Sequence, residues 1–494
     1  MNFAETIKPL DTTDAKLTEN GARAYNTLHQ PLVELFAQIG ALRPRSEIEI
    51  SNKFATAFAT NPMLATKMMF YAGNIRGGLG ERRTFKICLK WLAQNFPGIV
   101  EKNIELIPHF NRYDALFELV DTPAEKAMWE FIKNTLINDI KIAKENVMST
   151  KRKGISLLAK WMPTETAHSK TTKKLAYKAA AALGLTARKY RIILSTLRKE
   201  INIVETLMSN GEWDKIDYEA VPSYAMKNYR NAFQEHDPYR FEQYKFSLVK
   251  GEGKVNASTL FPYDLVHQYM NKGLYNIDTI IEAQWKALPN YVSGENNVII
   301  MADVSGSMYG RPMETSIGLA TYFAQHNNGP YAGLYMTFSS SPHFVTINKN
   351  DALHSIIRKV ENTGVGFSTN LDAAFAKILS HARENNVSNA EMPKALVVIS
   401  DMEIDPFFTG SRKLDFVQKW EVVYKSYGYT LPQLILWNVE ARNDTFLSQN
   451  EHVLFVSGQS TSVFKNLCAA LDGMTAYDLM IKTLSDPMYD CVQI

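Results

Sequence analysis

The chain has 494 residues, of which 46% are hydrophobic and 21% are charged. These values are typical of a soluble globular protein and exclude disordered and fibrous classes, and the length favours two or three domains over one core. No apolar stretch reaches the roughly 18 residues that span a membrane, and the N-terminus lacks the features of a signal peptide. Cys88, Cys468 and Cys491 form neither a zinc pattern nor an even disulfide framework. We therefore expect a cytoplasmic protein without membrane contact.

The net charge of +3 is unevenly distributed along the chain. Residues 141–200 contain fifteen Lys and Arg and three Glu, so this segment carries +12 and the remainder carries −9. A basic cluster of this density is the electrostatic footprint of a protein that binds phosphate backbones. The alternative is a merely solvated face, which is the common role of charge runs.

Residues 1–25 are polar and show no periodic pattern, which predicts a tail. From residue 26 to residue 292, apolar residues recur at helical spacing, as Leu32, Leu35 and Phe36 do. We find no convincing alternating strand and no repeat of fixed period in this region. The pattern predicts an all-α helical array.

Residues 73–83 have the most unusual local composition of that array, because four glycines and three arginines precede a predicted helix near Thr84. Backbone N–H groups, together with Arg76, Arg82 and Arg83, would form a phosphate site at the helix N-terminus. The segment is not a Walker A loop, because the Gly-Lys-Ser/Thr ending is missing. The alternative is a tight interhelical turn with solvated arginines.

The basic segment contains a predicted helix from Thr186 to about Met208, whose buried stripe would be Ile192, Ile193, Leu197, Ile201 and Val204. Basic residues off that stripe would face solvent together. Such a face predicts affinity for polyanions without sequence specificity. The candidate RNA contacts in and beside this segment are Lys151, Arg152, Lys153, Lys170, Lys173, Lys174, Arg188, Lys189, Arg191, Arg198 and Lys199.

A polar stretch with Pro and Gly at residues 289–297 predicts a boundary between a helical domain, 26–292, and a second domain, 293–494. Strands and helices alternate in the second domain, which predicts right-handed crossovers and a doubly wound α/β sheet. The expected strands are 298–302, 331–338, 344–347, 395–400, 433–438 and 452–456, and the expected helices are 314–325, 351–360, 370–385, 412–427 and 461–471.

Polar residues follow two of these strands. Asp303, Ser305 and Ser307 come after the first, Thr369 lies in a Gly-rich loop, and Asp401 ends the strand at 395–400. Sheets of this kind place ligand sites at the carboxyl ends of their strands. On an extended loop Asp303, Ser305 and Ser307 would point to one side, where carboxylate and hydroxyl oxygens suit a hard cation. The five residues together predict a metal site.

The order Asp-x-Ser-x-Ser, Thr and strand-terminal Asp resembles the metal-ion-dependent adhesion site of von Willebrand factor A domains. The resemblance implies a Rossmann-like domain and Mg²⁺ or another divalent cation. It also implies that Ser305 and Ser307 bind the ion directly, and that Asp303, Thr369 and Asp401 bind it directly or through water. A partner protein would complete the coordination with an acidic side chain.

A second resemblance covers roughly residues 15–490. The chain resembles the uncharacterised DUF2828 family, which is similar to TROVE and Ro-type proteins in joining a helical array to a von Willebrand factor A domain. The resemblance implies binding of structured noncoding or misfolded RNA by the basic residues named above. It rests on residues 20–21, 73–83, 106–117, 191–205 and 216–224, followed by the metal-site domain.

These patterns predict a noncatalytic RNA-binding protein whose metal site captures a protein partner. A structural scaffold that assembles through the second domain without RNA is one alternative. A metal-dependent phosphoesterase is another, since Asp401 and Glu403 are paired carboxylates and acids with Mg²⁺ can cleave phosphoesters. Neither Glu403 nor Asp405 has an acid-base partner at a recognisable spacing, so we expect no catalytic residue.

Overall fold

The fold is described from a computed structural model of the chain. The residues that the structure describes are 15–17, 23–25, 27–148, 153–201, 203–270, 276–292, 296–338, 342–362, 370–403, 416–442, 445–446, 453–468 and 474–494.

The first part of the chain is mainly helical, which confirms the prediction of a helical N-terminal region. Local sequence sets the helix starts: Ser46 and Glu49 form a reciprocal capping box, and Asn61 caps the next helix ahead of Pro62. The helices are α3 (Pro31–Gln38), α4 (Glu47–Thr60), α5 (Pro62–Gly73), α6 (Arg82–Asn95), α7 (Pro97–Lys102), α8 (Leu106–Phe110), α9 (Glu125–Met148), α10 (Leu158–Trp161), α11 (Lys170–Ala182), α12 (Ala187–Ile201), α13 (Val204–Ser209), α14 (Ser223–His236), α15 (Pro238–Lys250), α16 (Pro262–Met270) and α17 (Thr279–Lys286).

Within the segment 1–25, which was expected to be a tail, the described residues form two short strands. They are β1 (Ala15–Leu17) and β2 (Arg23–Tyr25), which pair antiparallel. Strands of three residues are too short to show an alternating pattern. The helix predicted from Thr186 to Met208 is two helices, α12 and α13.

The apolar stripe predicted for this segment was correct in part, because Leu197 and Val204 are buried and Ile193 and Ile201 pack half-buried against the core. The residues that α12 buries are Tyr190, Leu194 and Leu197, whereas Ile192 is 55% exposed. The β-branched residues Ile201, Ile203 and Val204 disfavour one continuous helix, and Val204 belongs to a different hydrophobic core from Leu197.

The second part is an α/β unit with a six-stranded mixed sheet. The strand order is β5-β4-β3-β6-β7-β8, with β5 antiparallel to β4 and the other neighbours parallel. Numbered from β3, this is the 3-2-1-4-5-6 order of doubly wound sheets. The strands are β3 (Val298–Asp303), β4 (Leu334–Phe338), β5 (His343–Thr346), β6 (Ala395–Ser400), β7 (Gln433–Asn438) and β8 (Leu454–Ser457).

Helices cover this sheet. Every residue of β3 and β6 is buried, as expected of parallel strands covered on both faces. Phe323 and Phe464 pack together, and Phe464 also meets Trp437 of β7 edge to face. The helices are α18 (Arg311–His326), α19 (Leu353–Asn362), α20 (Leu371–Glu384), α21 (Phe416–Ser426), α22 (Val463–Leu467) and α23 (Ala476–Leu484).

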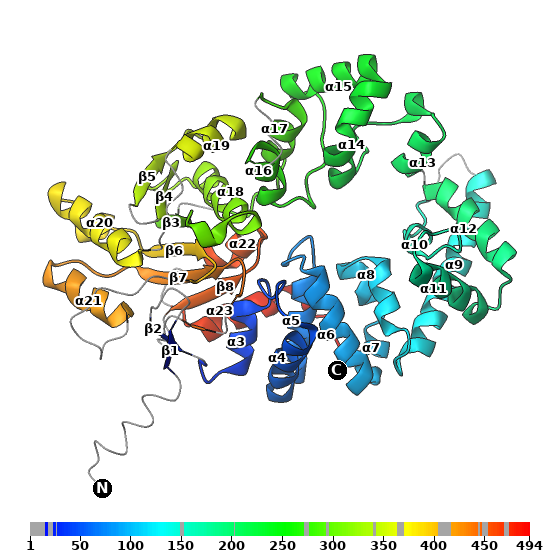
Figure 1. The fold of residues 1–494 in the computed structure, drawn as a ribbon, viewed down its shortest axis with the longest axis horizontal. Coiled ribbons are helices and arrows are strands. Elements are labelled where there is room, and N and C mark those ends of the chain that lie inside the picture. Colours follow the sequence, from blue (N-terminus) through cyan, green and yellow to red (C-terminus); the bar gives the residue numbers. More distant parts are fainter. Residues whose placement is uncertain are drawn as a thin grey trace, which may run out of the picture.

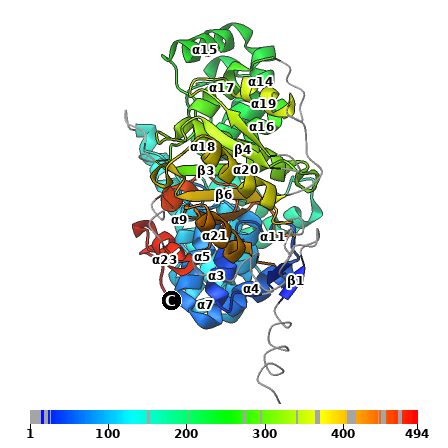
Figure 2. The same cartoon turned by 90° about the vertical axis from the view of Figure 1, so that its left-hand side faces the viewer.

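The helical array and the α/β unit meet at two places (Figures 1 and 2). At one, α16 packs along α18. At the other, the end of α3 reaches the end of β8, where Gly40 N donates to Ser457 Oγ at 2.9 Å. A Cβ at Gly40 would lie 2.6 Å from the Ser457 carbonyl, so only glycine permits this approach. The helical array and the α/β unit therefore form a closed ring.

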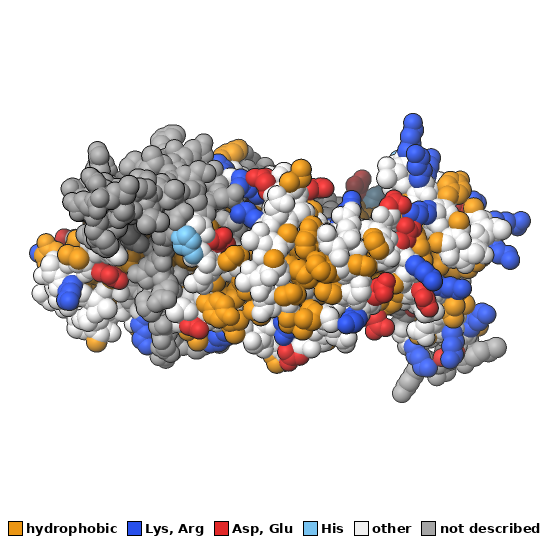
Figure 3. Space-filling model, turned by 90° about the horizontal axis from the view of Figure 1, so that it is seen from below, with side chains coloured by type: hydrophobic (Ala, Val, Ile, Leu, Met, Phe, Trp, Pro, Cys, Tyr) orange, Lys and Arg blue, Asp and Glu red, His pale blue; other side chains and the backbone are white. Residues whose placement is uncertain are grey.

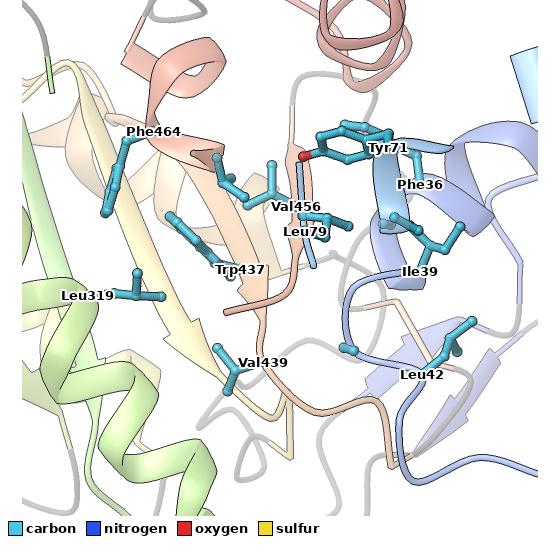
Figure 4. Packing of buried hydrophobic residues seen from close by; sticks show 14 of the residues in the cluster. Phe36, Ile39, Leu42, Tyr71, Leu79, Leu319, Trp437, Val439, Val456 and Phe464 are labelled. Carbon is cyan, nitrogen blue, oxygen red and sulfur yellow. The ribbon is translucent and has the colours of Figure 1, made fainter. Parts of the chain in front are cut away.

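One hydrophobic core runs across this second junction (Figure 4). Phe36, Ile39 and Tyr71 from the array face Val456 and Trp437 of the sheet. The last residues strengthen the contact: the turn Pro487–Tyr489 (η6), which lies beyond the last predicted element, packs against α5. Packing is thus continuous across the boundary expected at residue 292. A separate smaller core joins α13, α14 and α15 to α17.

Candidate metal centre and basic surface

Asp303 ends β3 at the point where the strand order of the sheet reverses, the usual ligand position in such folds. Its side chain is fully buried. One carboxylate oxygen accepts a hydrogen bond from Ser305 N at 2.9 Å, and the other accepts from Ser400 Oγ at 2.6 Å. Both oxygens of Asp303 are thereby fixed by neighbouring backbone and side chain.

Ser305 and Ser307 lie beside Asp303, with their hydroxyl oxygens 3.2 Å apart. The expected extended loop ends at Ser305, because Gly306–Met308 forms a 3₁₀ turn (η3). Despite this turn, the two hydroxyls lie close to each other. Ser305 is buried and Ser307 is half-buried.

Asp401 follows β6, whose register with β3 places it at the same edge of the sheet as Asp303. Its Oδ1 accepts a hydrogen bond from Glu403 N at 3.2 Å. Its Oδ2 is buried and accepts no hydrogen bond from the described residues. The structure thus brings together four of the five predicted metal ligands, whereas Thr369 lies outside the described residues.

Burial raises the pKa of both carboxyl groups. The pKa of Asp303 rises to about 7, first because burial disfavours the charged form and second because of the charge of Asp401. Burial likewise raises the pKa of Asp401, against the lowering effects of the Glu403 N–H and Arg442. Two such carboxylates at one sheet edge are stabilised by a cation.

The donor set fits a hard divalent cation, because hydroxyl and carboxylate oxygens are its preferred ligands. At this site, Oδ2 of Asp401 is buried and accepts no hydrogen bond from the described residues, and the two serine hydroxyls lie within 3.2 Å of each other. Within the described parts of the chain, no three His, Cys, Asp or Glu side chains form a conventional metal cluster. The candidate site contains only two acidic side chains, and its other ligands are hydroxyls, so it is not a cluster of that kind.

Sequence reasoning missed two residues of this site. Ser400 donates to Asp303 and receives a hydrogen bond from Met402 N, which fixes the turn after β6. Its position just before Asp401 was a usable signal. Arg442 has its Nε 3.5 Å from Asp401 Oδ2 and also donates to the carbonyl of Ser307. No local pattern marks Arg442, because only the tertiary fold brings it here.

The basic surface lies on α11 and α12, and Figure 3 shows Lys and Arg side chains gathered at the corresponding end of the molecule. Six of the candidate RNA contacts are exposed and form no ion pair with a described residue; they are Lys170, Lys173, Lys174, Arg188, Lys189 and Lys199. Lys153 is exposed too, but it pairs with Glu145 at 3.1 Å. Lys151 and Arg152 lie outside the described residues.

Two arginines of α12 that were candidate RNA contacts form contacts within the protein. Arg198 was expected to face solvent, but its guanidinium donates to the carbonyls of Ala159 and Met162 at 2.8 and 2.9 Å. Burial lowers its pKa. Arg191 is exposed but pairs with Glu165. Arg198 thus uses its hydrogen-bond donors to hold α10 against α12.

The Gly-rich segment 73–83 lies at the junction with the α/β unit, in another part of the array. Gly78 packs so closely that a Cβ would lie 2.1 Å from the carbonyl oxygen of Tyr71. Its own carbonyl accepts a hydrogen bond from Ser462 Oγ at 2.7 Å. Arg76, Arg82 and Arg83 are all exposed, and Arg83 also donates to the carbonyl of Arg45 at 2.7 Å. Close packing accounts for these glycines.

The fold and site define a protein that joins a helical array to an α/β unit with polar residues at its strand ends. Residues 18–113 and 176–295 match the family described as Domain of unknown function (DUF2828), which confirms that resemblance over those residues. Residues 297–477 match Domain of unknown function (DUF7788). Uncharacterized protein L728 of Acanthamoeba polyphaga mimivirus is 27% identical over 485 residues, or 91% of this chain and 83% of that protein. In the described residues, no helix is long and apolar enough to cross a membrane.

Proposed function

We propose that this chain is a noncatalytic binding protein whose α/β unit, a von Willebrand factor A-like domain, captures a protein partner through a divalent cation. The observation that carries this proposal is the buried Oδ2 of Asp401, which accepts no hydrogen bond from the described residues and lies beside the hydroxyls of Ser305 and Ser307. Mg²⁺ held there would accept an acidic side chain of the partner. Asp303, hydrogen-bonded through both oxygens, would hold the loop and act through water.

Mg²⁺ is expected to raise the Tm of the wild-type protein and to leave that of Asp303→Asn unchanged, because a ligand that binds only the folded state stabilises it. Thermal unfolding at pH 8 across a Mg²⁺ series measures this effect. Asp214→Asn, a change at an exposed carboxylate outside the site, is the matched control and should respond like the wild type. Equal shifts in Asp303→Asn and Asp214→Asn would refute the site.

We also propose that the helical array binds RNA through the backbone phosphates. Six exposed cations on α11 and α12 lack an ion-pair partner among the described residues, which supports a polyanion ligand. The resemblance to TROVE and Ro-type proteins is the reason for naming RNA as that polyanion.

Reversing two charges on α11, Lys173→Glu with Lys174→Glu, is expected to weaken RNA binding at least about tenfold, because two phosphate contacts become repulsive. Filter binding across a salt series measures both the affinity and its salt slope. The control, Lys286→Glu with Lys425→Glu, makes the same charge change on α17 and α21. Wild-type affinity that is absent or insensitive to salt would favour the scaffold alternative.

A further inference from the structure

Arg442 places a guanidinium beside the candidate metal centre, although nothing in its local sequence marks it. Its Nη2 donates to the carbonyl of Ser307, and its Nε and Nη2 reach Glu440 at 3.4 and 3.3 Å. Its Nε lies 3.5 Å from Oδ2 of Asp401. The side chain is held by these contacts, but it is 34% exposed and can still move away from Asp401.

This position puts Arg442 in competition with a metal ion. Oδ2 of Asp401 is the buried oxygen without a hydrogen bond, so it is the oxygen that a cation would use. It is also the oxygen of Asp401 that pairs with Arg442. Two cations beside one carboxylate oxygen in a buried setting repel each other, since the low dielectric strengthens the interaction. Glu440 offers Arg442 an alternative acidic partner next to Asp401.

The backbone of Arg442 belongs to the junction with the helical array. Its carbonyl accepts a hydrogen bond from Arg45 Nη1 at 2.6 Å, and the preceding residue, Ala441, donates its N–H to the carbonyl of Ala41 at 2.9 Å. Ala41 and Arg45 follow α3. Arg442 thus touches the metal centre with its side chain and the helical array with its main chain.

We propose that Arg442 is the resident counter-cation of this site, that a divalent cation must displace it from Asp401, and that the displacement loosens the contact with residues 41–45. This inference rests on the proposed metal site. Arg442 then sets the affinity of the site and links ion binding to the packing of the helical array. In the ion-free protein, its charge compensates Asp401.

The first test measures Mg²⁺ affinity by calorimetry at pH 8 for the full-length wild type, Arg442→Gln, Arg442→Lys and Arg383→Gln. Arg442→Gln should bind at least about tenfold more tightly than the wild type, because the competing charge is gone while a polar side chain remains. Arg442→Lys keeps the charge and should stay close to the wild type. Arg383→Gln removes a cation that lies over Tyr427 on another helix and should have no effect.

The outcomes separate the two proposals. Binding by the wild type with unchanged affinity in Arg442→Gln would overturn the role of Arg442 and leave the metal site standing. Equal gains in the Gln and Lys variants would also overturn it, because the effect would not follow charge. No binding by any variant would overturn the metal site itself. Binding only by Arg442→Gln would support both proposals.

A second readout is the hydrogen exchange of the Ala441 amide. Saturating Mg²⁺ should speed its exchange in the wild type, because displacement of Arg442 weakens the hydrogen bond to Ala41 O. The exchange in Arg442→Gln should not change on adding Mg²⁺. Unchanged exchange in a metal-bound wild type would refute the coupling to the array.

Discussion

Mg²⁺ binding by the wild-type protein is expected to weaken about tenfold between pH 8 and pH 6. The pKa of Asp303 is raised to about 7 by burial and by the charge of Asp401, and a metal site requires its carboxylate to be ionised. At pH 8 most Asp303 side chains are charged, whereas at pH 6 a proton must leave before the ion binds. Calorimetry in buffers of different ionisation enthalpy measures both the affinity and the proton released.

The same pKa predicts the stability of the ion-free protein. A carboxyl group with a raised pKa retains its proton in the folded state over a pH range in which the unfolded chain has lost it. The stability contributed by neutral Asp303 is therefore complete below about pH 4 and is lost as the pH rises to about 7. Asp303→Asn cannot ionise, so without metal it should unfold at a higher temperature than the wild type at pH 8.

This pair of measurements separates binding from folding. A variant that is more stable and binds no ion shows that Asp303 is retained for binding. Metal affinity that does not change between pH 6 and pH 8 would contradict the raised pKa, and a less stable Asp303→Asn at pH 8 would contradict the cost of burying this charge.

The sequence predicted the part of the site that depends on strands. Asp303 and Asp401 follow long apolar runs, and such runs become neighbouring parallel strands whose ends meet. Arg442 and Arg45 could not be found in this way. Arg45 and Arg442 meet although they are about 400 residues apart, and the contacts of Arg442 with Asp401 and Ser307 also form only in the tertiary fold.

The helical array shows the same limit. Helical spacing correctly predicted helices, but which face of α12 is buried depends on packing against α9 and α10. The predicted stripe included Ile192, which is exposed, and the predicted solvent face included Arg198, which bonds to two carbonyls. Sequence periodicity locates an amphipathic helix more reliably than it assigns each residue at the edge of the apolar stripe.

Replacing Tyr489 with alanine is expected to lower the Tm by roughly 10 °C, the largest stability effect we predict. Tyr489 is almost fully buried between Phe110, whose ring it stacks on at 5.4 Å, and Tyr71, which it meets edge to face at 6.2 Å. Asn74 donates to its hydroxyl at 3.2 Å. Losing a buried aromatic ring costs about 3–5 kcal/mol, and each kcal/mol lowers the Tm of a large domain by about 2–4 °C.

The loss of the Tyr489 ring should weaken the contact between the helical array and the α/β unit. Tyr489 belongs to the segment after the α/β unit, whereas its neighbours belong to α5 and α8. Tyr489→Phe keeps the ring and removes only the acceptor for Asn74, so it should cost about 1 kcal/mol. Tyr477→Ala, at a 45% exposed position of α23, is the control for a general weakness of the C-terminal segment. If Tyr489→Ala melts like Tyr477→Ala, the C-terminal segment does not hold the helical array against the sheet.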